Sequence, residues 1–533
     1  MKPSAAAVAQ ARLVRSLANP SCFGPRCTAV RLIETHISYV LLTGSDAYKI
    51  KKAIKLEFVD FESLDARHVF CERELELNRR FAPNVYVDVV AITGTADAPV
   101  VGGDGPAIEY AVRMREFPQE ALLSSIAAAG GLTEARIDEL AQAVASFHAT
   151  AARADPDAPI ATPAIVRELA MANFTEMAPL VTAPDVVSAL ARLQRWTARE
   201  LEAIAPRLDE RRRNGFIRDG HGDLHLDNIV VVDGRVTLFD CLEFSSRMRW
   251  GDVLSDAAFV VMDLHRRGRP QLANRFVDAY LEATGDYAGI DVLRFYVVYR
   301  AMVRAKVAAI AATGAAADAR LRRLGECRDY LALAERWTAP QRGAIVITCG
   351  LAGSGKTTLT GRLVDLCGAI RVRTDIERKR LHNLGARDES RSALNSGIYS
   401  ASATEQTYSR VAAVARRIAA AGYLAICDGA FLKKSQRDRL RTVATDLSVP
   451  FSIVQVAASH DTLRRRIADR RRQRDDASEA GLEVLEEQIR IAEELTTDEW
   501  SHAIRYDAEI DRLDLSSLRI AQLESRGPVT HAA

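Results

Sequence analysis

The stretch "AIVITCGLAGSGKT" (residues 344–357) constrains the fold of this 533-residue chain more than any other feature. An apolar, strand-like run leads into the pattern G-x-x-x-x-G-K-[ST], and a helical pattern follows. Glycines let backbone N–H groups approach a phosphate without a Cβ clash, and the N-terminus of the following helix adds positive potential. We expect Lys356 to reach the β- and γ-phosphates and Thr357 to give its hydroxyl to Mg²⁺. The loop residues expected to bind ATP are Gly350, Gly353, Ser354, Gly355, Lys356, Thr357 and Thr358.

The segments after this loop predict a parallel α/β sheet. Strand-like runs "IRVRT", "YLAICDG" and "FSIVQVA" alternate with helical patterns. Ligands of such sheets bind where the strands end. Asp375 follows one strand and is expected to accept the proton of an acceptor hydroxyl, with Arg378 positioning the acceptor. Asp428 ends another strand and is expected either to hold the metal, through water, or to help position the acceptor.

An arginine-rich segment, "LRRRIADRRRQRDD", comes next. Arginines that close over phosphates can stabilise the charge of a transferring phosphoryl group. Arg470 and Arg474 lie four residues apart on one helix face and are the predicted lid arginines. A solvated helix and an RNA-binding patch are the alternatives. The interspersed aspartates and the lack of nearby aromatic residues argue against the RNA-binding patch.

The first half of the chain contains a second constellation, "HGDLHLDNIVVVDGRVTLFD" (residues 221–240). In kinase chemistry an Asp accepts the proton of the attacking hydroxyl, and an Asn and a second Asp hold magnesium. Asp223, Asn228 and Asp240 have the matching types and spacing. An Asp233-Gly234 turn predicts a hairpin that returns Asp240 to Asn228. Glu243 is expected either to join or orient the metal ligands or to be a surface carboxylate.

The residues before this loop predict a small strand-rich lobe with one helix. In such a lobe a strand Lys pairs with the α- and β-phosphates of ATP and is held by a helix Glu. Lys49 and Lys51 lie on one face of a strand, since side chains alternate along it. We favour Lys49, with Lys51 as the alternative, and Glu74 as the helix partner, with Glu72 as the alternative. No G-x-G-x-x-G is present; "ETHIS" (residues 34–38) stands in its place.

Three other residues on helical patterns have chemistry to offer. His148 lies on a mostly apolar helix and is expected to be a packed core residue. Arg300 and Arg304 share one helix face. They are expected either to bind an anionic acceptor near Asp223 or to form solvated salt bridges.

Composition limits the class of protein. The length predicts about three domains or lobes at roughly 100–200 residues each. The net charge of +2 gives no general attraction to nucleic acid or membranes. None of the eight cysteines forms a C-x-x-C pair, which favours free thiols in a reducing compartment. Polar residues interrupt the N-terminal helical pattern, and no apolar run approaches the ~20 residues of a membrane span. We therefore expect a cytoplasmic location.

The motifs carry a family resemblance. The loop H-G-D-x-H-x-x-N followed by an Asp-led motif resembles the aminoglycoside phosphotransferase and choline kinase superfamily, in which His221 and His225 would be scaffold residues. The P-loop half resembles the gluconate kinase, zeta toxin and polynucleotide kinase group. The chain from about residue 30 to 515 is similar to a bacterial family that joins both kinds of domain, and runs such as "YKIKK" and "CERELELNRR" support this. The resemblance implies ATP and Mg²⁺ at both sites.

The predicted fold is an α+β, protein-kinase-like domain of the aminoglycoside phosphotransferase type, followed by an α/β P-loop kinase-like domain with a parallel sheet. The predicted regions are an N-terminal helical extension (1–29), a small lobe (30–113), a large helical lobe with the catalytic loop (114–337), a linker (338–343), the P-loop domain (344–515) and a tail (516–533).

The predicted function is that of a bifunctional, ATP-dependent phosphotransferase acting on hydroxyls of small-molecule acceptors. Two alternatives remain open. One domain is a nucleotide-binding regulator of the other, or the P-loop domain phosphorylates 5′-hydroxyls of nucleic acid. The near-zero net charge argues against a nucleic-acid partner.

Overall fold

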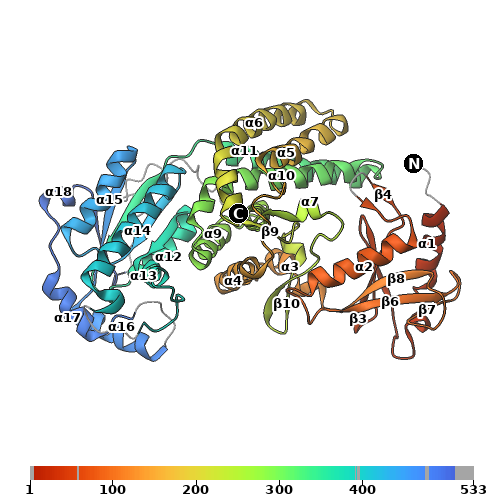
Figure 1. Cartoon of the computed structure of the whole chain (residues 1–533), viewed down its shortest axis with the longest axis horizontal. Helices are drawn as coiled ribbons and strands as arrows, with labels where there is room; N and C mark the ends of the chain where they lie inside the picture. Colours follow the sequence, from red (N-terminus) through yellow and green to blue (C-terminus); the bar gives the residue numbers. More distant parts are fainter. Residues whose placement is uncertain (1–4, 57–58, 391, 393–395, 474–478, 511–533) are drawn as a thin grey trace. The chain divides into compact units, whose positions relative to one another are not determined.

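The computed structural model describes residues 5–56, 59–390, 392, 396–473 and 479–510 (Figure 1). The chain divides into two compact units. Unit 1 comprises Met1–Ala183, Thr197–Asp263 and Tyr299–Leu324; unit 2 comprises Pro184–Trp196, Leu264–Val298 and Gly325–Ala533. The domain boundaries drawn from the sequence stay predictions, and the predicted tail over 516–533 lies outside the described residues.

Unit 1 begins with an antiparallel sheet of six strands in the order β1-β2-β3-β8-β6-β7. Strands β2 and β3 form the hairpin expected from the Thr43–Asp46 turn, in which Gly44 has a φ of +93°. The bounds of the six strands are β1 Arg31–Glu34, β2 Ser38–Leu42, β3 Asp46–Lys51, β6 Tyr86–Gly94, β7 Pro99–Val101 and β8 Glu109–Arg115.

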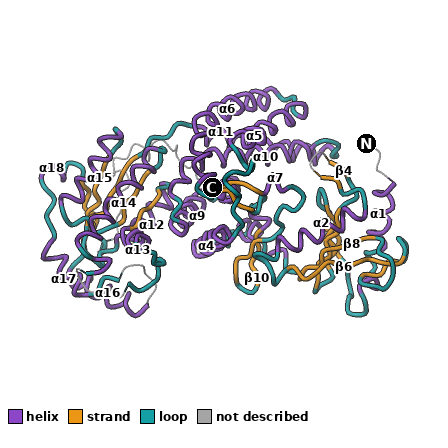
Figure 2. The backbone as a smooth tube through the Cα atoms, in the orientation of Figure 1, coloured by secondary structure: helices purple, strands orange, loops and turns teal. Residues whose placement is uncertain are grey.

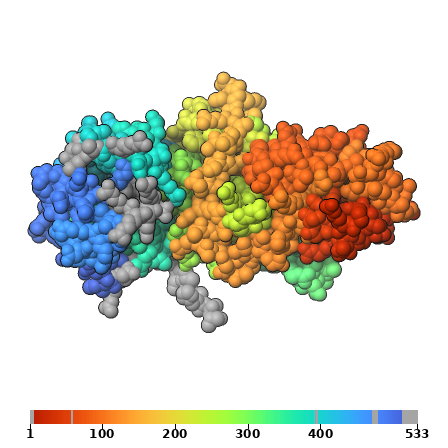
Figure 3. Space-filling model, turned by 90° about the horizontal axis from the view of Figure 1, so that it is seen from below, coloured from red at the N-terminus to blue at the C-terminus, as the bar shows by residue number. Residues whose placement is uncertain are grey.

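Helix α2 (Leu64–Asn78) packs against β8 and β6, with Cys71 and Leu75 in the core beneath it. Its N-terminus is capped by Ser63, whose hydroxyl accepts a hydrogen bond from the Ala66 N–H. Leu13 of helix α1 (Ala5–Ser16) and Leu17, directly after it, are buried in a second cluster of the same sheet, and the N-terminal segment forms part of the surface (Figure 3). Helix α2 is therefore fixed over β8, the strand next to the β3 strand that carries Lys49.

The rest of unit 1 is mainly helical, with two short strand pairs that shape the predicted catalytic loop. Hairpin β10–β11 is antiparallel, as is the pair β9–β12. Helices α6, α8, α10 and α11 carry residues of both units. The remaining bounds are η1 Pro20–Phe23, β4 Lys55–Leu56, β5 Val59–Asp60, η2 Gln119–Ala121, α3 Leu123–Ala128, α4 Glu134–Thr150, α5 Pro163–Met177, η3 Ala178–Leu180, α6 Pro184–Arg213, β9 Ile217–Asp219, η4 Leu226–Asn228, β10 Ile229–Val232, β11 Arg235–Leu238, α7 Ser246–Arg249, β12 Trp250–Asp252, α8 Val253–Arg266, α10 Ile290–Ala312 and α11 Ala317–Thr338.

Unit 2 is built on a parallel sheet of five strands in the order β14-β15-β13-β16-β17 (Figure 2). All six residues of β13 (Ala344–Cys349) are buried, which explains why this strand is an unbroken apolar run rather than an alternating one. The other strands are β14 Ile370–Arg373, β15 Leu424–Asp428, β16 Phe451–Ala457 and β17 Ala503–Asp507. The predicted parallel sheet is confirmed.

Helices flank this sheet (Figure 2). Helix α9 (Pro270–Thr284), which precedes the strands by about sixty residues, packs against α12 and β14. The other elements are η5 Tyr287–Gly289, α12 Lys356–Cys367, α13 Thr374–Leu381, η6 Gly397–Tyr399, α14 Ala401–Ala420, α15 Lys434–Leu447, α16 His460–Gln473, α17 Leu482–Ile491 and α18 Thr497–Trp500. Among the described residues, no helix has the length and apolarity needed to cross a membrane.

Candidate active sites

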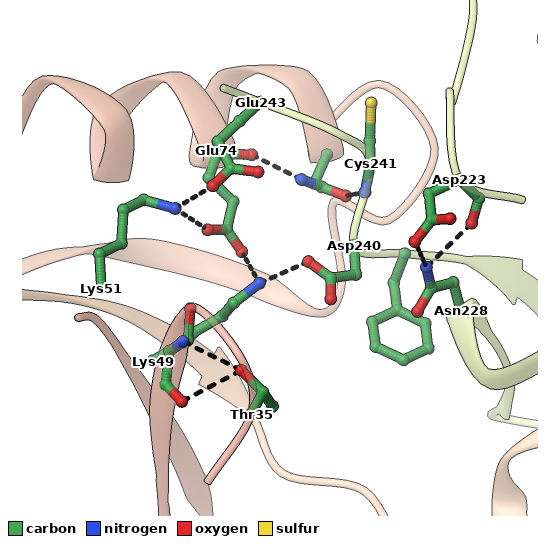
Figure 4. Close-up of polar contacts among 12 residues, drawn as sticks. Thr35, Lys49, Lys51, Glu74, Asp223, Asn228, Asp240, Cys241 and Glu243 are labelled. Atoms are coloured by element: carbon green, nitrogen blue, oxygen red, sulfur yellow. Dashed lines mark hydrogen bonds and ion pairs between the residues drawn. The ribbon is translucent and has the colours of Figure 1, made fainter. Parts of the chain in front are cut away.

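The loop from His221 to Asn228 brings together the predicted base and the first predicted metal ligand of unit 1. The Asn228 side-chain amide donates to the backbone carbonyl of Asp223 at 2.9 Å and to its carboxylate at 3.1 Å (Figure 4). Hairpin β10–β11 turns at Asp233, and its return strand leads to Phe239, whose N–H donates to the Asn228 carbonyl at 3.0 Å. The hairpin thus returns the chain beside Asn228, as the Asp233-Gly234 signal predicted.

The loop is anchored from helix α8 by a residue that the sequence did not single out. The buried Asp256 carboxylate accepts hydrogen bonds from the N–H groups of His221, at 2.7 Å, and Gly222, at 3.0 Å. His148 lies 3.5 Å from the same carboxylate and is buried, in agreement with the expected packed residue. The one signal for Asp256 was an acidic residue within an apolar helix.

Arg300 and Arg304, paired on one helix face by the sequence, differ in the structure. Arg300 is buried and donates to the carbonyls of Gly222, at 2.9 Å, and Ser255, at 3.1 Å. It therefore supports the loop instead of facing an acceptor. Arg304, one turn further along α10, is half-buried and acts electrostatically on Asp223.

His225 lies beside the predicted base. Its Nε2 atom is 3.4 Å from the Asp223 carboxylate, and its Nδ1 atom is 3.4 Å from that of Asp227. Burial favours the neutral ring, but the neighbouring carboxylates outweigh it and raise the pKa of His225 to about 9. Although burial opposes ionisation, His225 and Arg304 hold the pKa of Asp223 below its usual range. Asp223 is therefore a carboxylate at neutral pH.

Lys49 on β3 lies between Glu74 and Asp240. Its ammonium is 2.9 Å from one oxygen of the buried Glu74 and also forms an ion pair with Asp240 (Figure 4). Burial disfavours the charged lysine, but Asp240 and Glu74 more than compensate and raise its pKa well above the usual value. The strand, the helix α2 and the segment after β11 thus meet at Lys49.

Lys51 contacts the other side of Glu74. Its ammonium is 2.7 Å from the second Glu74 oxygen and pairs with Glu243, and all three side chains are buried. Burial opposes ionisation of Glu74, but Lys49 and Lys51 lower its pKa to about 2. Burial raises the pKa of Glu243 despite the contact with Lys51. Glu243 is therefore not the surface carboxylate that the sequence left open.

The backbone at Asp240 adopts a left-handed conformation, with a φ of +60°. This conformation is unfavourable for a residue other than glycine and persists only where the surroundings enforce it. The Asp240 N–H donates to the Tyr86 hydroxyl at 3.1 Å, and the Cys241 N–H donates to the Asn78 side-chain carbonyl at 2.9 Å. Such strain commonly occurs at functional positions.

In unit 2 the glycine-rich loop joins β13 to α12. Gly353 and Gly355 have φ values of +80° and +96°, and a Cβ on Gly350 would come within 2.4 Å of the Val456 carbonyl oxygen. Glycine is therefore required by conformation and by close packing. Lys356 opens α12 and donates to the carbonyls of Gly350, at 3.0 Å, and Leu351, at 2.7 Å.

A pocket of about 440 Å³ lies next to this loop. It is lined by the loop, by Asp375 and Arg378 of α13, and by Asp428 at the end of β15. The structure therefore brings Lys356, Thr357, Asp375, Arg378 and Asp428 to one pocket. Among the described residues, the Asp375 carboxylate has no hydrogen-bond donor or ion-pair partner, whereas Asp428 accepts from the Thr360 hydroxyl at 3.1 Å.

Arg378 lines this pocket, and its described contacts are with neighbouring residues of the protein. It is buried, its guanidinium lies over the Tyr399 ring, and it donates to the Ile398 carbonyl at 2.8 Å and to the Thr404 hydroxyl at 3.1 Å. These contacts hold together part of the pocket lining, which includes Arg378, Tyr399 and Thr404. Any role toward an acceptor stays a prediction.

Two pocket residues were missed by the sequence. Arg466 of α16 donates to the Ser354 carbonyl at 3.3 Å and to the Ala508 carbonyl at 3.0 Å. The side-chain oxygen of Gln488, on α17, accepts from the Ala352 N–H at 2.7 Å. Arg466 stands four residues before the predicted lid residue Arg470, so helical spacing was the available signal. The Arg470 side chain and all of Arg474 lie outside the described residues.

Both sites suit Mg²⁺ only in combination with phosphates. The described residues contain no cluster of three or more His, Cys, Asp or Glu side chains placed to hold a metal ion. Mg²⁺ usually takes one or two protein oxygens and completes its shell with phosphate oxygens and water. Asn228 and Asp240 in unit 1, and Thr357 and Asp428 in unit 2, offer donors of this kind.

Comparison with known proteins identifies both halves. Residues 59–296 match the model of the "Phosphotransferase enzyme family", and residues 345–495 match the model described as "AAA domain". An uncharacterised protein of Mycobacterium tuberculosis (strain H37Rv) is 31% identical over 450 residues, which is 84% of this chain and 87% of that protein. An uncharacterised protein of Mycobacterium bovis matches to the same extent.

Two solved structures are among those to which the chain is similar. A gluconokinase from Sinorhizobium meliloti 1021 covers 35% of this chain and 94% of its own, with 18% identity and a TM-score of 0.24. A choline kinase from Cryptosporidium parvum covers 62% of this chain and 96% of its own, with 13% identity and a TM-score of 0.38.

Proposed function

Since the chain belongs to a bacterial family that joins a phosphotransferase domain of the aminoglycoside type to a P-loop kinase-type domain, we propose that it is a bifunctional ATP-dependent kinase. Each unit would transfer the γ-phosphate of ATP to a hydroxyl of a small-molecule acceptor. The observation that carries the proposal is that each unit gathers residues of the types that phosphoryl transfer needs.

In unit 1, Lys49 would bind the α- and β-phosphates while Glu74 holds its ammonium in place. Asn228 and Asp240 would hold Mg²⁺, which neutralises charge on the phosphates when it is bound. Asp223 would orient the acceptor hydroxyl and take its proton as the oxygen forms a bond to the γ-phosphorus. The bond from that phosphorus to the β–γ bridging oxygen breaks, and ADP leaves.

In unit 2, the backbone N–H groups of the glycine-rich loop would cradle the phosphates of a second ATP, with Lys356 on the β- and γ-phosphates. Thr357 and Asp428 would hold Mg²⁺. Asp375 lines the same pocket as the loop and would take the acceptor proton, since no described residue donates a hydrogen bond to its carboxylate. Arg466 contacts the loop directly and would add positive charge near the phosphates.

The test uses the purified chain with ATP, Mg²⁺ and a bacterial metabolite extract, and follows new phosphorylated masses by mass spectrometry. We expect Asp223→Ala to abolish one product and Lys356→Ala to abolish a different one. Lys52→Ala and Arg465→Ala, which change exposed or partly exposed cations outside both sites, are matched controls that retain both products. If both products survive in each active-site variant, the bifunctional kinase is refuted.

A nucleotide-gated regulator is the other outcome that this experiment recognises. Gating requires nucleotide binding without acceptor phosphorylation. In that case Lys356→Ala would alter the single product of unit 1, whereas Asp375→Ala would leave it unchanged.

A further inference from the structure

Five charged side chains of unit 1 form an alternating series: Asp240, Lys49, Glu74, Lys51 and Glu243 (Figure 4). Glu74 lies at the centre, with one oxygen 2.9 Å from Lys49 and the other 2.7 Å from Lys51. A phosphate-binding lysine accounts for the half of this series that contains Lys49. It does not account for the half that contains Lys51 and Glu243.

The two ends of the series differ in exposure. The Asp240 side chain is 37% exposed, whereas the Glu243 side chain is 4% exposed and that of Lys51 is fully buried. A nucleotide and its metal ion can therefore reach Asp240 and, through it, Lys49. Lys51 and Glu243 are closed to them in this arrangement.

The buried end connects three segments of the chain. Lys51 belongs to strand β3, Glu74 to helix α2, and Glu243 to the segment that follows Asp240. The same segment is attached to α2 by the Cys241 N–H on Asn78, at 2.9 Å, and to the catalytic loop by the Leu242 N–H on the His221 carbonyl, at 3.0 Å. The strained backbone of Asp240 lies directly next to these attachments.

We propose that Lys51 and Glu243 are positioning residues that fix α2 and the Asp240 segment in one arrangement, leaving Lys49 free to exchange partners with phosphate. The inference rests on the kinase function proposed for unit 1. When Lys49 turns from Asp240 toward ATP, Glu74 remains held by Lys51. Helix α2 then needs no ligand to keep its place.

Two consequences separate this proposal from the alternatives that the sequence left open. Glu243 contacts Lys51 and is not a metal ligand, so its charge is not required for metal binding. Lys51 is not a second phosphate lysine, so its main effect is on α2 and not on the affinity for ATP.

The metal test uses the full chain with Lys356→Ala, which silences the P-loop site, and Mn²⁺ with ATP as the probe. Mn²⁺ binding is followed by electron paramagnetic resonance. We expect Asp240→Asn to weaken Mn²⁺·ATP binding by about tenfold or more, the scale of losing one ligand charge. Glu243→Gln, which keeps a hydrogen-bonding side chain beside Lys51, leaves the affinity within about twofold. An equal loss in both variants overturns the proposal.

The helix test measures hydrogen exchange of the α2 amides in the same background. We expect Lys51→Met to speed exchange in α2 by about tenfold or more, because it leaves two buried carboxylates without their shared cation. Lys49→Met leaves α2 protected but weakens ATP binding. Lys52→Met is the matched control, since Lys52 is the neighbouring lysine and pairs with Glu34 at 2.7 Å.

If Lys51→Met does not fold, Lys51→Arg and Glu243→Gln carry the test. Arginine retains the charge and α2 stays protected, whereas Glu243→Gln speeds exchange at α2 through the loss of the outer charge. The proposal is contradicted if Lys49→Met speeds hydrogen exchange in α2 as much as the changes at Lys51 do. Failure of the Lys356→Ala parent itself to bind Mn²⁺·ATP would instead refute the kinase function of unit 1.

Discussion

At the scale of single residues, His225 is the side chain whose charge state most affects the predicted base of unit 1. Two carboxylates face its ring nitrogens at 3.4 Å each. The Asp227 N–H also lies 3.3 Å from Nδ1, a contact that only the neutral ring accepts. Burial opposes the charged ring, but the two carboxylates outweigh it, so the imidazolium is favoured and the pKa rises to about 9.

The raised pKa of His225 predicts a stability that depends on pH. The folded chain holds this proton more tightly than the unfolded chain, whose histidines titrate near pH ~6.5. The stabilisation is complete below that value and is lost as pH rises through about 9. We expect the free energy of unfolding of unit 1 to fall over this range, by up to about 3 kcal/mol.

Urea denaturation from pH 6 to 10 checks this expectation, with NMR of the imidazole as a direct reading of its titration. His225→Gln removes the fall, whereas His460→Gln, at an exposed position of unit 2, retains it. A His225 ring that titrates near pH ~6.5 would contradict the charge arrangement described for the loop.

The candidate residues of unit 1 show which features a sequence reveals at this scale. Spacing alone brought Asp223, Asn228 and Asp240 to one place, because a two-residue turn fixes the geometry of the hairpin between them. Spacing did not distinguish Lys49 from Lys51, since both lie on the same face of β3. The two lysines differ in the carboxylate that each contacts besides Glu74, which is Asp240 for Lys49 and Glu243 for Lys51. Glu243 is 192 residues from Lys51 in the chain, so local spacing does not reveal the contact.

At the scale of elements, helix α9 supports the strand that leads to Asp375. The buried Asp278 carboxylate accepts from the Arg371 N–H at 2.6 Å and lies 3.3 Å from the Arg371 guanidinium. That guanidinium also donates to the Thr357 carbonyl at 3.4 Å. Helix α9 thereby contacts β14 and, through Arg371, the end of the phosphate-binding loop.

Asp278 predicts a second pH dependence, in unit 2. Burial raises the pKa of Asp278 to about 7, and Glu282 adds to the rise while Arg371 and Arg373 oppose it. The folded chain keeps this proton up to about pH 7, whereas the unfolded chain releases it near pH ~4. Stability from the protonated carboxyl is therefore lost as pH rises through about 7.

Between pH ~5 and ~8 we expect the unfolding free energy of the parent to fall by about 2 kcal/mol more than that of Asp278→Asn, because asparagine cannot ionise. Hydrogen exchange of β14 in increasing urea measures this local stability. Asp291→Asn is the control, because Asp291 pairs with Arg417 elsewhere in unit 2, at 2.8 Å. Identical pH profiles for the parent and Asp278→Asn would show that Asp278 is ionised throughout.

The sequence predicted an element well where its own hydrophobic pattern determines its structure. It predicted poorly which other element a helix packs against. The unbroken apolar runs at β13, β15 and β16 indicated buried parallel strands, and the sheet confirms them. Helix α9 lies within the region that the sequence assigned to the large helical lobe (114–337). Its place beside α12 and β14 depends on Asn274, Asp278 and their partners in unit 2, and a helical pattern does not identify its partner.

At the scale of the whole molecule, one chain joins two unrelated folds, each with its own candidate triphosphate site. The sheets of the two units have different topologies, one antiparallel and one parallel. Among the described residues, each candidate site is built from side chains of one unit. The unit 1 site contains Lys49, Glu74, Asp223, Asn228 and Asp240. The unit 2 site contains Lys356, Thr357, Asp375 and Asp428. Each unit therefore contains its own complete set of the residues proposed to hold a nucleotide.

This independence predicts the stoichiometry of nucleotide binding. Equilibrium dialysis with a non-hydrolysable ATP analogue and Mg²⁺ is expected to give two equivalents for the parent. At a ligand concentration that just saturates the parent, Asp240→Asn and Lys356→Ala each leave one site filled, and the double variant leaves its one remaining, weakened site mostly empty. If the units are uncoupled, the affinity of each remaining site stays within about twofold of its value in the parent. If they are coupled, the loss of either site changes the affinity of the other by the same factor, because coupling between two sites is reciprocal. A larger change at both sites would favour a nucleotide-gated regulator, whereas one equivalent in the parent would refute two working sites.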